Sequence, residues 1–167
     1  MTRLWLNSVT PIAPPRSANP GVRTLLYAAT VTGLWAGFFS LAIYSLGRLL
    51  GVPFTVVLGA DQAPVQLGWF MPVIFPLVSA LLAGLATMLV LGRRHARAIV
   101  WWVGAIVALS TVAMPAMQPS EVLWSTRIWL LVMHVVAWFL IVPQLARIAG
   151  DSEPSASEHR ELQLHSR

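Results

Sequence analysis

The stretch that decides the fold, residues 125–145, reads STRIWLLVMHVVAWFLIVPQL. It holds few polar side chains, and a run of about 20 mostly apolar residues is long enough to cross the hydrocarbon core of a bilayer as an α-helix. A helix satisfies its own backbone hydrogen bonds, which lipid cannot do for an irregular chain. This stretch is therefore predicted to lie within a transmembrane span at residues 122–146.

Three further apolar stretches precede it, at residues 24–49, 69–92 and 98–117. Each is near the length that a membrane crossing requires. The chain is therefore predicted to be all-α, an integral membrane four-helix bundle. The short basic sequence GRRHAR, at residues 92–97, is expected to join the second and third spans in a tight hairpin.

Outside the transmembrane domain, which is predicted at residues 23–149, the chain carries little information. Residues 1–22 contain four prolines among polar residues, which disfavours a continuous helix. Residues 150–167 mix serine, acids and bases without an apolar face. Both segments are predicted to be disordered cytoplasmic tails.

Composition narrows the class of protein. Apolar residues make up 57% of the 167 residues and charged residues 10%, against about 25% charged in an average soluble domain. No separate catalytic or nucleic-acid-binding domain fits in what remains. The absence of cysteine excludes disulfides, thiolate metal sites and iron–sulfur clusters. We therefore expect no cofactor, no metal and no nucleic-acid partner.

The arginines indicate the topology. They gather before the first span, between the second and third, and after the fourth: Arg3, Arg16, Arg23, Arg93, Arg94, Arg97, Arg147, Arg160 and Arg167. The positive-inside rule then places these segments and both termini in the cytoplasm, in a multi-pass protein of the inner (plasma) membrane. Trp101 and Trp102 follow the basic loop and are interpreted as anchors at the membrane interface.

Small residues recur every fourth position in the first two spans. The positions are Ala29, Gly33 and Gly37 in the first, and Ser79 with Ala83 and Ala80 with Gly84 in the second. Such rows let two helix backbones approach closely. Packing within the chain is favoured over a homodimer, because three partner helices are already tethered.

The fourth span holds the chief polar constellation, Arg127 and His134. Seven residues separate them, which places them on one helix face about 10 Å apart, and ionisable groups at this depth usually face protein. For His134 the alternatives are a proton relay, a metal or haem ligand, a general base, or a neutral imidazole bonded to a neighbouring span, for example at Ser40, Ser79 or Ser110. The last is favoured.

For Arg127 the sequence offers structural and functional alternatives. The side chain can snorkel outward or pair with Glu121 or Asp61, the acids of the two predicted external loops. Alternatively, together with Arg48, it can anchor an anionic lipid or substrate at the outer mouth of the bundle. Two arginines facing two acids favour pairing.

The order of the spans and the fourth span itself carry a resemblance to a known family. The matching residues are Thr126, Arg127, Met133, His134, Ala137, Ile141, Pro143 and Leu145. With the spans before them, they resemble an uncharacterised family of small actinobacterial four-helix membrane proteins, domain of unknown function 6069. The resemblance covers about residues 24–149 and implies no activity.

Three functional classes follow, in order of preference. The first is a structural or accessory component that binds lipid, a membrane protein partner or a second copy of itself. The second is a small carrier or channel that uses the face of Arg127 and His134. The third is a membrane enzyme with His134 as its proton-transfer group. Because no acid, metal set or nucleophile lies at the depth of His134, no enzymatic activity is expected.

Overall fold

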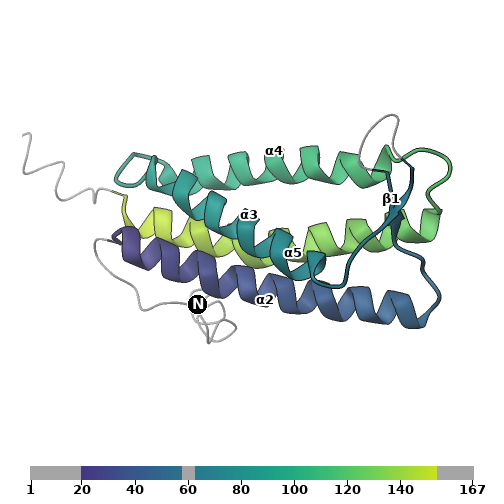
Figure 1. Ribbon diagram of the computed structural model, residues 1–167. Coiled ribbons are helices and arrows are strands. Elements are labelled where there is room, and N and C mark those ends of the chain that lie inside the picture. The colour runs from purple at the N-terminus through teal and green to yellow at the C-terminus, as the bar shows by residue number, and fades with distance from the viewer. Residues whose placement is uncertain (1–19, 58–62, 154–167) are drawn as a thin grey trace, which may run out of the picture.

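The computed structural model describes residues 20–57 and 63–153 (Figure 1). This part of the chain contains four helices, each long and apolar enough to cross a membrane. They are α2 (Val22–Leu49), α3 (Met71–Met88), α4 (Ala96–Ala116) and α5 (Trp124–Asp151). Two short strands, β1 (Thr55–Val56) and β2 (Val65–Gln66), pair antiparallel between α2 and α3. The predicted all-α architecture is thus found over the described residues.

The helix ends differ from the sequence prediction at two places. α3 stops at Met88, before the predicted end at 92, and the turn that follows reaches Gly92, whose φ of 71° favours glycine. α5 continues through Gly150 to Asp151, into the segment that was expected to be a tail. The remainder of the two expected tails, residues 1–19 and 154–167, lies outside the described residues.

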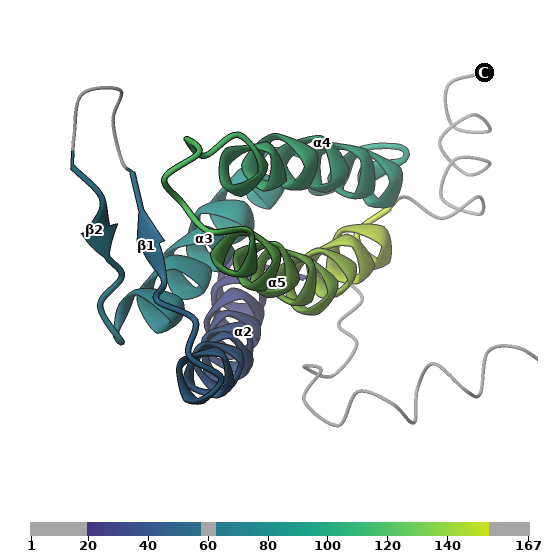
Figure 2. The ribbon, with the colours of Figure 1, turned by 90° about the vertical axis from the view of Figure 1, so that its right-hand side faces the viewer.

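The helices pack as two pairs joined through α5. α2 packs against α3 and α5, whereas α4 makes its substantial contacts with α5. Viewed from one end, α5 lies between α2 and α4 (Figure 2). The short loop joins α3 to α4, but the two helices do not pack closely as the predicted tight hairpin requires. α3 packs on α2, and α4 packs on α5.

Small residues bring α2 and α3 into close contact. A Cβ atom added at Gly37 would lie 3.0 Å from the carbonyl oxygen of Val73, and one added at Gly33 would lie 2.9 Å from the Cβ of Ala80. Such spacing leaves no room for a larger side chain. The interface between these helices therefore requires glycine at both positions.

The second helix of this pair uses one of its two predicted rows. Ala80 and Gly84 are buried, and a Cβ added at Gly84 would lie 2.8 Å from the Cβ of Ala29. Ser79 is exposed and Ala83 is half-buried. The row that faces α2 is therefore the one that contains Ala80 and Gly84.

The strands form a small hairpin at the end of the bundle opposite the α3–α4 loop (Figure 1). Phe54, fully buried with a φ of 50°, stacks against Tyr44 at 4.5 Å between ring centroids. The Tyr44 hydroxyl donates a hydrogen bond to the Leu67 carbonyl (2.9 Å). The Gln118 side-chain amide bonds both the N–H and the carbonyl of Val57. These contacts fasten the hairpin to α2 and to the α4–α5 loop.

Candidate functional site

Arg127 lies in the first turn of α5 with 7% of its surface exposed. Its guanidinium donates to three backbone carbonyls, those of Val122 (3.2 Å), Ala116 (3.3 Å) and Pro119 (2.7 Å). The guanidinium carbon also lies 4.6 Å from the centroid of the Trp124 ring. Ala116 is the last residue of α4, and carbonyls at a helix end lack partners within the helix. Arg127 therefore ties the end of α4 and its loop to α5.

The acids expected to pair with Arg127 do not do so in the described residues. Glu121 is exposed, and Asp61 lies outside the described residues. Arg48 is also exposed and donates to the Pro53 carbonyl at 3.2 Å. Among the described residues the Arg127 guanidinium bonds backbone carbonyls, since a planar group with five N–H donors can serve several acceptors at once. The expected pairing with Asp61 lies outside the described residues and stays a prediction.

His134 is half-buried on α5, seven residues from Arg127. Its Nδ1 lies 2.8 Å from the Leu130 carbonyl of the same helix. A carbonyl only accepts, so Nδ1 carries the hydrogen of this contact. The expected serine partners on other spans are not used: Ser110 donates to its own helix, and the hydroxyl of Ser40 is buried without a partner in the described residues. The third, Ser79, is exposed.

No metal-binding constellation accompanies this histidine in the part of the chain that the structure describes. Within residues 20–57 and 63–153, no three side chains of histidine, cysteine, aspartate or glutamate lie close enough together to hold an ion. His134 therefore has no protein ligands to share a metal with among these residues. Its contact to its own helix instead fixes the ring tautomer.

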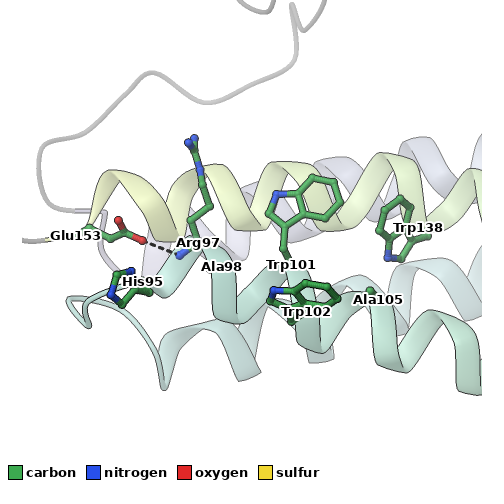
Figure 3. Close-up of a pocket in the computed structure, with 8 residues that line it drawn as sticks. All are labelled: His95, Arg97, Ala98, Trp101, Trp102, Ala105, Trp138 and Glu153. Atoms are coloured by element: carbon green, nitrogen blue, oxygen red, sulfur yellow. Dashed lines mark hydrogen bonds between the residues drawn. The ribbon is translucent and has the colours of Figure 1, made fainter.

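A pocket lies near the other end of α4, where α4 begins and α5 ends (Figure 3). Its volume is about 670 Å³. The lining residues come from the start of α4 and the residue before it, from α5, and from the second residue after α5: His95, Arg97, Ala98, Trp101, Trp102, Ala105, Trp138 and Glu153. The pocket is thus polar at the loop end and aromatic further into the membrane domain.

The aromatic part of the pocket joins α4 to α5. Trp101 and Trp138 meet edge to face with their ring centroids 5.2 Å apart. The Trp138 indole N–H donates to the Gly104 carbonyl at 3.1 Å. A Cβ added at Gly104 would lie 2.7 Å from a methyl carbon of Val142. The two helices therefore approach closely here and hold the indole rings in fixed positions.

In the polar part, two residues after α5 form hydrogen bonds with the start of α4 and the loop before it. The Glu153 carboxylate accepts a hydrogen bond from the Arg97 backbone N–H at 2.9 Å (Figure 3). The Ser152 hydroxyl oxygen accepts one from the Gly92 N–H at 3.0 Å. Glu153 thereby satisfies a free donor at the N-terminus of α4 and places a negative charge at the positive end of the helix. The Arg97 side chain itself lies over Gly150.

The sequence indicated only one wall of this pocket. Trp101 and Trp102, which follow Arg97 by four and five residues, predicted an interfacial position for the start of α4. Trp138 and Glu153 lie far along the chain and carry no local signal of their own. Only the packing of α4 on α5 brings them to the same place.

The chain was compared with known proteins. The model of a family described as a family of unknown function (DUF6069) matches residues 20–151, which include all four described helices. No curated protein and no solved structure matches the chain.

Proposed function

Because the chain belongs to this family of unknown function, we propose its role from its own residues: it is a structural or accessory membrane component that binds a membrane protein partner. This role involves neither transport nor catalysis. The exposure of α4 is the observation that supports it.

α4 is the least enclosed of the four described helices. In its most apolar stretch 6% of the residues are buried, against 33% for α2. Side chains such as Val107, Leu109 and Met114 are largely exposed. Since α4 packs chiefly on α5, its remaining surface is free to contact a helix of another membrane protein. This supports a role in which α4 is the recognition helix.

The carrier alternative depends on Arg127 and His134, and the contacts of Arg127 do not fit a transport role. All the carbonyl bonds of Arg127 serve the α4–α5 connection, so the guanidinium is not open to a passing solute. His134 remains, and in the described residues it belongs to no group of three or more histidine, cysteine, aspartate or glutamate side chains. The same isolation of His134 speaks against the enzyme alternative.

The partner proposal can be tested by photo-crosslinking in the native membrane. A photoreactive amino acid at Val107, on the exposed side of α4, is expected to give one adduct of defined mass that contains a second protein. The matched control is Leu82 on α3, which is similarly exposed. If both positions give only lipid adducts, the proposed partner role is wrong.

We further propose that both termini are cytoplasmic. The α3–α4 loop, with Arg93 and Arg94, lies at the same end of the bundle as the start of α2 and the end of α5 (Figure 1). An even number of spans with a basic inner loop fits this orientation. Enzymatic reporters fused at either terminus are expected to be active only if they work in the cytoplasm. Activity of a reporter that requires the external side would reverse the orientation.

A further inference from the structure

We propose that the pocket between the start of α4 and the end of α5 binds one anionic phospholipid. Its phosphate would lie at Arg97, and its glycerol and upper acyl chains would lie against the tryptophans. The inference rests on the proposed function, because the pocket faces the inner leaflet only if the termini are cytoplasmic.

Positive charge gathers in the sequence at the start of α4, which forms the loop end of the pocket. Arg93, Arg94 and Arg97 are all exposed, within five consecutive residues. Glu153 is the one carboxylate that lines the pocket, and its charge is directed to the backbone N–H of Arg97. No carboxylate among the described residues holds the Arg97 guanidinium. The region therefore carries excess positive charge that an anionic headgroup can neutralise.

The positive charge at the loop end of the pocket does not come from the N-terminus of α4 alone. The free N–H donors at the start of α4 are an ordinary anion site, but Glu153 already occupies one of them. A bound phosphate would therefore contact the Arg97 side chain. This arrangement favours a ligand whose phosphate stays at the loop end of the pocket, which Arg97 lines.

The inner part of the pocket suits the apolar part of a lipid. Trp101, Trp102 and Trp138 supply broad apolar faces, and Ala98 and Ala105 leave space between them. Eight residues of α4 separate Arg97 from Ala105, which is about 12 Å along a helix. A phosphate at one end and an apolar wall along this length match an amphipathic lipid. A free phosphate would leave the tryptophan faces without a partner.

The test is native mass spectrometry of the purified full chain in mild detergent. The protein is titrated with phosphatidylglycerol or with phosphatidylcholine of identical acyl chains. We expect one tightly bound phosphatidylglycerol and clearly weaker phosphatidylcholine. Arg97→Gln should weaken phosphatidylglycerol about fivefold, as expected for the loss of one arginine near an anionic lipid, and should leave phosphatidylcholine unchanged.

Two further variants make the test specific. Arg48→Gln removes an exposed arginine at the opposite end of the bundle and should leave both affinities unchanged. Trp102→Ala removes a largely exposed pocket side chain and should weaken both lipids. Because Arg97→Gln keeps the backbone N–H that Glu153 binds, its unfolding temperature should match that of the parent. If it is lower, the ratio of the two lipid affinities is compared instead, because partial unfolding should weaken both lipids whereas loss of the Arg97 charge should weaken phosphatidylglycerol alone.

Three results would overturn the proposal. These are equal affinity for the two lipids, an Arg97→Gln variant with unchanged phosphatidylglycerol affinity, and displacement of the lipid by inorganic phosphate, which would indicate a site for free anions. The purified chain carries no partner, so such a failure leaves the crosslinking result on α4 unaffected. Loss of the α4 adduct would likewise leave the lipid titration unaffected.

Discussion

Arg127→Leu is expected to lower the free energy of unfolding by about 3 kcal/mol, because it leaves three backbone carbonyls without a donor. Removing a buried partner costs more than the bond itself contributes, since the remaining acceptor is shielded from water. The stacking of the guanidinium on Trp124 is lost as well. The α4–α5 connection should therefore loosen before the rest of the bundle.

The measurement is an unfolding titration in detergent, followed by circular dichroism. Arg127→Lys should fall between the parent and Arg127→Leu, since a single ammonium lacks the planar fork that serves three carbonyls. Arg48→Leu is the control: it removes an arginine with one exposed bond, to Pro53, and should cost well under 1 kcal/mol. An Arg127→Leu variant as stable as the parent would show that these carbonyl bonds contribute nothing.

Gly37→Leu is expected to destabilise the protein by about 2–3 kcal/mol by forcing α2 away from α3. The neighbours of the new side chain are the backbone oxygen and Cα of Val73, at 3.0 and 3.1 Å from the Cβ position. Backbone atoms cannot rotate aside as a side chain does. The two helices must therefore separate or shift along each other.

Ala42→Leu provides the matched control in the same helix. Ala42 is exposed on α2, so the larger side chain enters no helix interface and should change stability little. Both variants are compared with the parent in the same unfolding titration. If Gly37→Leu matches Ala42→Leu, the close approach of α2 to α3 is not required for stability.

Much of the fold could be predicted from the sequence, because membrane spans depend on simple physical quantities. The length and apolarity of the four stretches are enough to place the helices, and α2 through α5 occupy them. The row of Gly33 and Gly37 likewise indicates a helix interface. Which of two rows on α3 faces α2 could not be predicted, because Ser79 and Ala80 are equally small.

The contacts of the candidate residues were less predictable. Burial of Arg127 follows from the cost of a charge in lipid, but its acceptors do not, since every residue has a carbonyl and only the path of the α4–α5 loop selects three of them. The pocket depends on the same kind of information. Glu153 reaches Arg97 because α5 runs past its predicted end.

The central position of α5 also affects how the protein is made. The ribosome completes α4 before α5, yet α4 packs chiefly on α5, whereas α2 and α3 can pair as soon as both are inserted. α4 therefore waits in the bilayer without its packing partner until the final helix emerges. During this interval the face of α4 that later packs on α5 is uncovered, so α4 is the last of the first three helices to become packed.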